Sequence, residues 1–293
     1  MIGVAELRIG VSGWRYGGWR GVFYPTGLAQ RRELEFISRQ LNSVEINGSF
    51  YSLQRPSSYR AWYEQTPEDF VFAVKGTRFV THMKRLRDVQ TPLANFFASG
   101  VLALGHKLGP VLWQLPPTSR FRPDVLADFF AMLPRSTGEA ARLAELHDER
   151  LAQPGRSLTS ADADRPIRHA LEVRHDSFKD PAFVDLLCEH DIGLVAADTA
   201  GKWPLIAELT ARDFGYMRLH GDKELYVSGY SSAALDEWAA KIRAWRDTGR
   251  DVFVYFDNDV KVRAPFDAIS LAGRLGLRRP AGHPHPVGRN TRS

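Results

Sequence analysis

Short apolar runs alternate along the chain with longer segments in which apolar residues recur at helical spacing. Runs of the first kind are typical of buried β-strands, and segments of the second kind are typical of helices that pack on one face. The pattern predicts eight strands, near Arg8–Ser12, Ser43–Asn47, Phe70–Lys75, Pro110–Leu115, His169–His175, Ile192–Asp198, Gly215–His220 and Asp251–Asn258.

Helical segments separate most of these strands, and several begin with a proline, which the first turn of a helix tolerates. They are expected at Arg31–Gln40, Ser57–Gln65, Pro92–Leu104, Pro123–Leu133, Pro181–His190, Ala233–Asp247 and Pro265–Leu275. The link between the sixth and seventh strands, around Leu205–Arg212, is at best a short helix. Strands joined by helices lie parallel with right-handed crossovers. Eight such units favour an α/β fold of the (β/α)8 TIM-barrel type, formed as a single domain by residues 1–279.

Two segments depart from the alternation. Residues 135–168 are rich in Ala, Arg and Glu and then in Ser, Asp and Gly. We expect them to form a surface insertion, part helix and part loop, between the fourth helix and the fifth strand. Residues 280–293 contain three prolines and two glycines, which predict a disordered tail.

The net charge of +5 permits an anionic partner without requiring one. Part of the excess lies near the C-terminus, in Arg278, Arg279, Arg289 and Arg292, so the folded part is closer to neutral. The single cysteine, Cys188, excludes an internal disulfide, and its helical setting favours a small buried side chain. No signal-peptide pattern opens the sequence and no apolar run is long enough to span a bilayer, so we expect a cytoplasmic protein without a membrane partner.

Polar side chains recur on one face of the predicted strands, because successive side chains of a strand point to opposite sides. In the fifth strand Leu171 and Val173 share one face, and Glu172 and Arg174 share the other. The apolar face must meet the helices, which offer no polar partners, so the polar face points into the barrel. The same reasoning places further polar residues inside: Glu45, Asn47, Lys75, Gln114, Arg218 and His220. Asp198 ends the sixth strand, and at least one of Asp257, Asn258 and Asp259 should face the mouth.

These residues predict an active-site cleft at the carboxyl ends of the strands, where barrel enzymes place their chemistry. Three cations suit an anionic substrate: Lys75, Arg174 and Arg218. Three carboxylates could act as bases or acids: Glu45, Glu172 and Asp198. His220 could move a proton, or it could simply hydrogen-bond a carboxylate. The alternative is a satisfied ionic network that only fills the barrel.

A divalent metal is a sharper hypothesis for the same side chains. Glu45, Glu172, Asp198 and His220 form an oxygen-and-nitrogen ligand set that would suit Mn, Mg or Zn. No local metal-binding motif accompanies them, and the neighbouring cations would oppose a bound metal. We therefore do not favour a metal cofactor.

Two loops could extend the cleft. Residues 76–88 carry five basic or histidine side chains, and this loop could close on a phosphate or a nucleic-acid backbone, or have no specific role. Residues 13–24 hold five aromatic side chains among glycines. They could stack on a sugar or a base, or pack as a lid over the barrel mouth.

Eight segments carry a resemblance to a known family: GVSGWRYGGWRGVFYP, NSVEINGSFY, FAVKGTRFVTHMKRL, GPVLWQLPP, HALEVRHDSF, VAADTAGKWP, YMRLHG and VYFDNDVKVRAPF. Together they resemble the YecE-like family, also called domain of unknown function 72, from about Arg8 to about Leu277. The resemblance implies a TIM barrel similar in shape to endonuclease IV and to xylose-isomerase-like barrels, and it implies no particular activity. Family motif positions map onto Trp14, Glu45, Asn47, Lys75, Gln114, Glu172, Arg174, Asp198, His220 and Asn258.

Three hypotheses of function follow. The leading one is an enzyme that acts by acid–base chemistry on a small phosphorylated, sugar-like or nucleotide-derived substrate, with Asn47, Gln114, Trp14 and Asn258 as further contacts. The second is a nucleic-acid-binding or repair protein that resembles endonuclease IV in shape, and its binding would weaken steeply with salt. The third is a ligand sensor without catalysis, which a ligand would stabilise without forming product.

Overall fold

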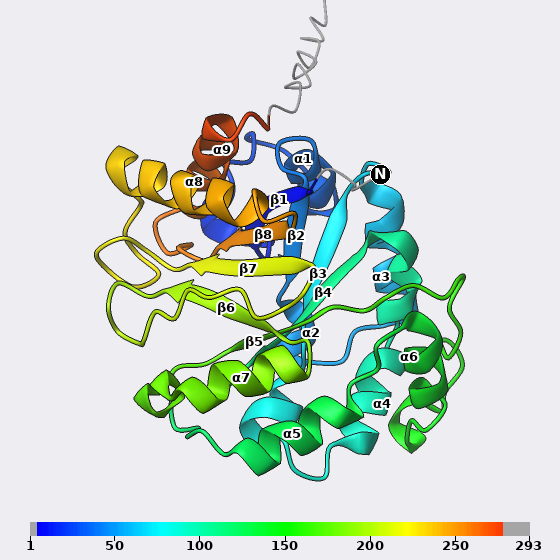
Figure 1. Cartoon of the computed structure of the whole chain (residues 1–293). Coiled ribbons are helices and arrows are strands. Elements are labelled where there is room, and N and C mark those ends of the chain that lie inside the picture. The colour runs from blue at the N-terminus through cyan, green and yellow to red at the C-terminus, as the bar shows by residue number, and fades with distance from the viewer. Residues whose placement is uncertain (1–4, 278–293) are drawn as a thin grey trace, which may run out of the picture.

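Eight parallel strands close into a barrel in which each strand pairs with its neighbours along the chain, and β1 pairs with β8 (Figure 1). The computed structural model describes residues 5–277. The strands are β1 Leu7–Ser12, β2 Ser43–Ile46, β3 Val71–Lys75, β4 Leu108–Gln114, β5 His169–Glu172, β6 Gly193–Asp198, β7 Phe214–Leu219 and β8 Asp251–Phe256. The predicted α/β class and TIM-barrel fold are therefore confirmed. The expected tail, residues 280–293, lies outside the described residues.

Helices surround the barrel (Figure 1). They are α1 Glu33–Ser38, α2 Gly48–Tyr51, α3 Pro56–Gln65, α4 Gln90–Ala98, α5 Pro123–Met132, α6 Thr137–Ala144, α7 Pro181–Glu189, α8 Ser232–Arg246 and α9 Ala264–Arg274. The helix expected over 92–104 divides in two, because Gly100 adopts a φ of 117° and ends α4 before the 3₁₀ segment Val101–Lys107. Over residues 5–277, no helix has the length and apolar character needed to cross a membrane.

The connection from β6 to β7 is the one for which the sequence predicts a short helix at best. Residues 199–213 contain no helix. Thr210 instead ties this segment to the strand: its hydroxyl donates to the Ile192 carbonyl at 2.6 Å and accepts the Leu194 N–H at 2.7 Å. The connection is therefore held along the base of β6 by a side chain.

Cys188 is exposed, so the expectation of a buried cysteine was wrong. It does lie in a helix, α7, whose buried side chains are Phe183 and Leu187. These two residues are four positions apart and form the inward stripe, since residues at this spacing share a helix face. Cys188 lies one position further on and turns away from the barrel.

The insertion over 135–168 is part helix and part loop, as expected, but it is not confined to the surface. Its helix α6 packs against α4, and both Ala140 and Ala144 are fully buried. The Ser136 hydroxyl caps α6 by accepting the Glu139 N–H at 3.2 Å. Small side chains at these positions let the inserted helix approach the outer layer of the barrel closely.

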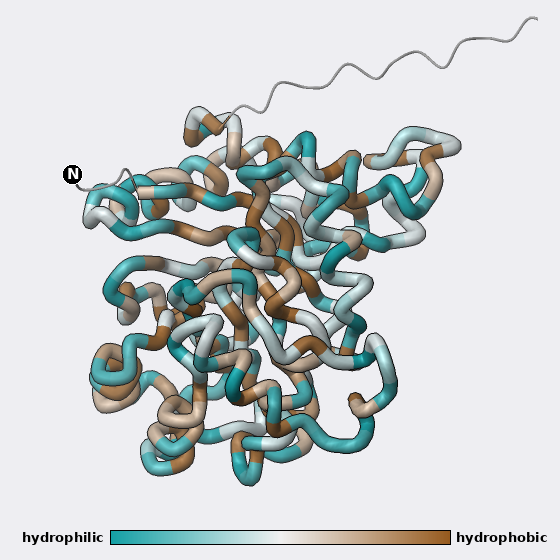
Figure 2. Tube along the Cα trace, turned by 90° about the vertical axis from the view of Figure 1, so that its right-hand side faces the viewer, coloured by the Kyte–Doolittle hydropathy of each residue, from teal (hydrophilic) through white to brown (hydrophobic). Residues whose placement is uncertain are grey.

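The apolar core has two parts. A large outer cluster lies between strands and helices, and it contains the predicted outward-facing residues of β2 to β5 and β7, among them Val44, Val74 and Trp113. A smaller cluster fills the lower barrel interior: Ala73, Leu112, Ala170, Val195, Ala197, Ala211, Phe214, Tyr216, Phe253 and Tyr255. Figure 2 shows the hydrophobic segments gathered at the centre of the molecule. Above this apolar floor, charged side chains occupy the carboxyl ends of the strands.

The close pairing of β1 with β2 leaves no room for a side chain at Gly10. A β-carbon at Gly10 would lie 2.1 Å from the Ser43 carbonyl oxygen, so Gly10→Ala must push the paired strands apart. We expect a loss of ~1–3 kcal/mol of unfolding free energy, as for other overpacked cores. Gly17→Ala is the control, because nothing lies within 4 Å of its β-carbon. Urea unfolding followed by tryptophan fluorescence measures both, and equal midpoints for the two variants would contradict the packing argument.

Candidate active site

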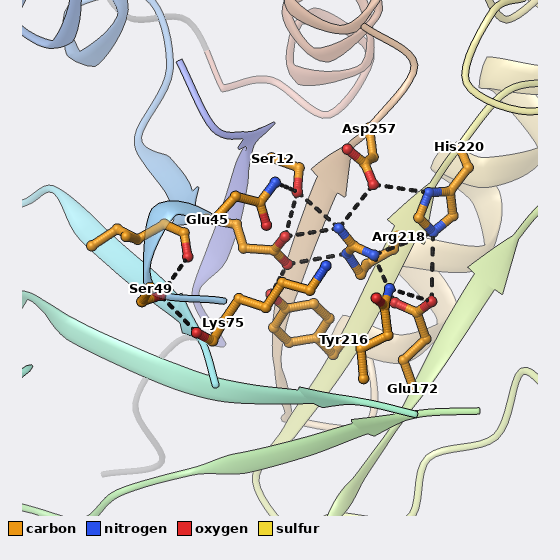
Figure 3. Close-up of polar contacts among 12 residues, drawn as sticks. Ser12, Glu45, Ser49, Lys75, Glu172, Tyr216, Arg218, His220 and Asp257 are labelled. Atoms are coloured by element: carbon orange, nitrogen blue, oxygen red, sulfur yellow. Dashed lines mark hydrogen bonds and ion pairs between the residues drawn. The ribbon is translucent and has the colours of Figure 1, made fainter. Parts of the chain in front are cut away.

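Arg218 lies at the centre of the polar interior, on β7 (Figure 3). Its fully buried guanidinium donates to Glu45 Oε1 at 2.9 Å, to Glu172 Oε2 at 2.7 Å and to Asp257 Oδ2 at 2.9 Å. A fourth contact, at 2.8 Å, reaches the Ser12 hydroxyl. We call the residues that surround this guanidinium the Arg218 cluster: Ser12, Glu45, Glu172, Tyr216, Arg218 and Asp257. One arginine thus joins side chains from β1, β2, β5 and β7 and from the end of β8.

The two buried glutamates of the cluster are densely hydrogen-bonded. Glu45 also accepts from the Ser12 hydroxyl and, at 2.6 Å, from the Tyr216 hydroxyl. Glu172 Oε1 accepts from the Gln114 amide at 2.9 Å and from Arg174 Nε at 2.7 Å. Burial alone would raise the pKa of Glu172, but Arg174 and Arg218 hold it well below its usual value. Both glutamates are fully buried, so they position the arginines and present no surface to a substrate.

Two cations line the mouth above the Arg218 cluster. The Lys75 side chain extends from the end of β3 toward the cluster and lies 4.3 Å over the Phe50 ring (Figure 3). Burial, followed by the charge of Arg218, lowers the pKa of Lys75 to about 8. Arg174 lies 4.2 Å over the Trp203 ring. Among the described residues, two of its nitrogens have acceptors: Nε donates to Glu172, and Nη2 donates to the Tyr226 hydroxyl at 3.3 Å.

His220 lies beside Asp257, with Nδ1 3.1 Å from the Asp257 Oδ2. The imidazole is fully buried, and the Tyr226 ring covers it edge-on with 5.3 Å between the ring centroids. Tyr226 has a φ of 64°, which is unfavourable for a side chain of this size. His220 is therefore inside the barrel as predicted, but it lies behind Tyr226 in this conformation.

Asp257 and Asp259 form a pair of carboxyl groups with opposite preferences. Burial would raise the pKa of Asp257, yet Arg218 and His220 lower it to about 2. Burial and the neighbouring Asp257 charge raise the pKa of Asp259 well above its usual value. The surroundings thus favour the ionised form of Asp257 and the protonated form of Asp259. The inward phase of β8, set by Phe253 and Tyr255, could have singled out Asp257 from the sequence.

His82 was expected only as part of the basic loop, but it lies at the mouth. A π-helical turn, Phe79–Met83, follows β3 and brings the His82 ring to 5.1 Å from the Phe50 ring. Burial and the charge of Lys75 lower the pKa of His82 to about 4, so its imidazole is neutral. Nothing in the hydrophobic pattern marks this turn, because it belongs to neither a strand nor a regular helix.

Asp198 and Asn258 do not line the mouth, which corrects two predicted site residues. Val195 and Ala197 set the inward phase of β6, so Asp198 points outward and accepts from the Tyr230 hydroxyl at 2.9 Å. Asn258 follows the inward Asp257 and donates to the Asp267 carboxylate at 2.8 Å. Asp257, which follows β8, supplies the aspartate that contacts Arg218.

Trp14 and Asn47 lie beside the mouth. The Asn47 amide donates to the Ser12 hydroxyl at 2.8 Å, and Trp14 packs edge-on against Trp62 with 5.3 Å between ring centroids. Both residues line a cavity of about 290 Å³, together with Tyr16, Tyr51, Gln54 and Trp62. Elsewhere in the aromatic segment, Trp19 and Tyr24 are buried in the core. The segment therefore packs as part of the barrel wall and also borders a cavity.

Metal-ligand geometry is absent from the described part of the chain. Among residues 5–277, no group of three or more His, Cys, Asp or Glu side chains is arranged to hold a metal ion. Glu45 and Glu172, two of the four proposed ligands, direct their oxygens at Arg218 instead. The donor set thus fits a guanidinium better than a divalent cation.

A closed TIM barrel with a charged interior at its carboxyl end is the class that fold and site define. The family model described as "Protein of unknown function DUF72" matches residues 8–290, so the chain belongs to the DUF72 family, as the sequence motifs indicated. It is 24% identical over 265 residues to UPF0759 protein YunF of Bacillus subtilis, covering 86% of this chain and 89% of YunF. It is 30% identical over 133 residues to UPF0759 protein YecE of Escherichia coli, covering 45% of each.

Solved structures of the same family have the same fold. A DUF72 family protein from Thermotoga maritima superposes with a TM-score of 0.72 at 23% identity, covering 92% of this chain and 99% of that one. Another from Enterococcus faecalis gives a TM-score of 0.67 at 16% identity, covering 94% and 97%. At these identities the similarity establishes the fold and leaves the chemistry of the mouth to be argued from its residues.

Removing the central guanidinium should be severely destabilising. Arg218→Met leaves three carboxylates without their shared partner, and breaking a buried ion pair in this way costs ~3–5 kcal/mol. Arg32→Met is the control, because Arg32 pairs with Glu35 on the surface and such pairs contribute about 1 kcal/mol or less. Chemical unfolding of both variants gives the comparison. Similar small losses would show that the Arg218 cluster does not depend on its arginine.

Replacing each of the two aspartates by asparagine should change the stability of the protein in opposite directions. Asp257→Asn removes a charge that pairs with Arg218 and should lower stability at neutral pH. The pKa of Asp259 is raised in the folded protein, so its carboxyl contributes stability that is fully present below the unfolded pKa of about 3.9 and is lost as pH rises through the folded pKa. Asp259→Asn should therefore match or exceed the wild type, increasingly so toward higher pH. Unfolding midpoints compared at about pH 5 and about pH 8 test this, and a large loss in Asp259→Asn would contradict it.

Proposed function

We propose that this protein is an enzyme that binds a small anionic substrate at the barrel mouth and acts on it by acid–base chemistry. The active face of a TIM barrel is the carboxyl end of its strands, and the charged residues gather at this end. The apolar floor made by Tyr216, Tyr255 and their neighbours closes the barrel beneath them. The substrate class is one with a phosphate or carboxylate group, as in phosphorylated sugars and nucleotide derivatives.

The observation that carries this proposal is the pair of mouth cations with unused donors. The Lys75 ammonium has no hydrogen bond or ion pair with any described residue, and Arg174 Nη1 has no hydrogen-bond acceptor among those residues. A guanidinium is well suited to bind a phosphate or carboxylate through two parallel N–H donors. Stacking on Trp203 and the bond to Glu172 hold Arg174 in place for that contact.

Proton transfer is assigned to the groups around the end of β8. The raised pKa of Asp259 favours its protonated form, which suits a general acid, and the lowered pKa of Asp257 keeps that carboxylate ionised beside it. Titratable groups whose environments separate their pKa values in this way mark the acid and base of many enzymes. His220 contacts Asp257 and could take part when the Tyr226 segment moves. Glu45 and Glu172 act as positioning residues through Arg218, and Gln114 steadies Glu172.

Nucleic-acid binding is the second candidate, supported by the loop over residues 76–88. Its basic side chains Arg78, Lys84, Arg85 and Arg87 are exposed on the mouth side of the molecule. Binding of duplex DNA that falls steeply as salt rises would favour this candidate, because the neutralised phosphates release their counterions. Binding that is absent at low salt would remove it.

Arg174→Gln should weaken the binding of inorganic phosphate by about tenfold or more, because a charge-assisted contact contributes ~1.5–3 kcal/mol. Arg150→Gln carries the same charge change in the inserted segment, where Arg150 pairs with Asp148, and should bind phosphate as the wild type does. Isothermal titration calorimetry on the full chain measures both affinities. Equal weakening in the two variants would mean that only general charge matters, and would remove the proposed anion site.

Turnover is tested with a panel of phosphorylated sugars and nucleotides, followed by phosphorus and proton NMR. An enzyme of the proposed kind forms a product, and Asp259→Asn should slow this by ~10²–10⁴-fold, the usual contribution of a general acid. A compound that raises the melting temperature without forming product would instead identify a ligand sensor.

A further inference from the structure

Two lysines are buried in this barrel, and their surroundings differ in one respect. Both ammonium groups lie over an aromatic ring, Lys107 at 4.2 Å from the Tyr63 centroid and Lys75 at 4.3 Å from the Phe50 centroid. Lys107 donates to the Tyr63 carbonyl at 2.7 Å, to the Thr66 carbonyl at 2.9 Å and to the Thr66 hydroxyl at 3.3 Å. Within residues 5–277 no hydrogen-bond acceptor contacts the Lys75 ammonium group. A lysine that serves packing alone would resemble Lys107, since a buried ammonium requires acceptors.

The acceptors near Lys75 are already engaged by other donors. Glu45, Glu172 and Asp257 each bind Arg218. The positive charge of Arg218 also lowers the pKa of Lys75. The titratable and charged groups that act on or face Lys75 come from five elements: Glu45 on β2, His82 on the π-helical turn, Glu172 on β5, Arg218 on β7 and Asp257 after β8. Arg174, two residues beyond the end of β5, also lowers the pKa of His82 through its charge.

The amine is also reachable from solvent. Lys75 is 7% exposed. Its Nζ atom has no hydrogen-bond partner among the described residues, yet it is not fully enclosed by protein. With a pKa of about 8, about one molecule in ten carries a neutral amine at pH 7. An ordinary lysine is neutral in fewer than about one molecule in a thousand. Lysines become nucleophiles in enzymes by this combination of an apolar surrounding and a neighbouring cation.

We propose that Lys75 is a nucleophile whose ε-amine adds to the carbonyl carbon of an aldehyde or ketone bound at the mouth and forms an imine. The inference rests on the proposed function and narrows the substrate to an anionic carbonyl compound, such as a 2-oxo acid or a phosphorylated sugar in its open form. Arg174 then holds the anionic end, and Lys75 is the group that reacts. Phe50 keeps the amine in an apolar contact on one side.

The step balances without a further reactant. The Lys75 ammonium first loses one proton to a base at the mouth, and the neutral amine then forms the C–N bond as the carbonyl π bond breaks. A second proton passes from nitrogen to the carbinolamine oxygen, the first proton returns to it, and the oxygen leaves as water. The sum is one ammonium and one carbonyl giving one iminium and one water, with no oxidation or reduction.

Reductive trapping tests the inference on the unaltered full chain. The protein is incubated with glyoxylate and cyanoborohydride, digested, and analysed by peptide mass spectrometry. We expect the adduct on Lys75 to form at least ~10-fold faster than on exposed Lys84, since Lys75 has on the order of a hundredfold more neutral amine. The rate on Lys75 should rise with pH and level off above about 8. Lys107 is the internal control for a buried lysine with its acceptors in place.

Acetaldehyde and the Arg174→Gln variant separate this inference from the proposed function. Trapping of Lys75 by glyoxylate that falls in Arg174→Gln, while trapping by acetaldehyde does not, supports both. Fast trapping by both aldehydes that ignores Arg174 supports the nucleophile and removes the anion site. Trapping of Lys75 no faster than that of Lys84 overturns the nucleophile, and Arg174-dependent phosphate binding then still supports the anion site.

Discussion

The structure depends on one buried charge. Arg218 has no contact with solvent, and an isolated ion in such a place would be strongly unfavourable. Three carboxylates from other parts of the barrel compensate it, Glu45, Glu172 and Asp257. Because each is needed for the others to remain buried, the cluster fixes the relative positions of β2, β5, β7 and the end of β8. The mouth inherits its geometry from that constraint.

The cluster also explains why the mouth carries cations. Three carboxylates exceed the single charge of Arg218, and Lys75 and Arg174 supply two more positive charges above it. Arg174 meets Glu172 directly, whereas Lys75 interacts with the carboxylates only through their field. One cation is thus anchored and the other is left without a hydrogen-bond acceptor among the described residues. That difference separates a group suited to hold an anion from a group suited to react.

The barrel and most of the inward residues could be predicted from the alternation of side chains. Val44 with Glu45, Leu171 with Glu172 and Met217 with Arg218 place one apolar and one polar face on each strand, and the structure has both faces as expected. The rule failed for Asp198, because β6 has no charged residue before it to set the phase and Val195 and Ala197 are as apolar as their outward neighbours. An apolar pattern on both faces carries no information about which side is the interior.

Contacts at the mouth could not be predicted from the sequence, for a different reason. Asp259 and His82 lie after the last residue of a strand, where the two-residue period no longer applies and the backbone turns. Their pKa values depend on groups from other elements, Asp257 for Asp259 and Lys75 for His82. The acceptor-free state of Lys75 is likewise a property of four strands together. Alternation along one strand identifies which side chains enter the barrel. Only the contacts made in the closed barrel determine which of those side chains remain without a partner and can react.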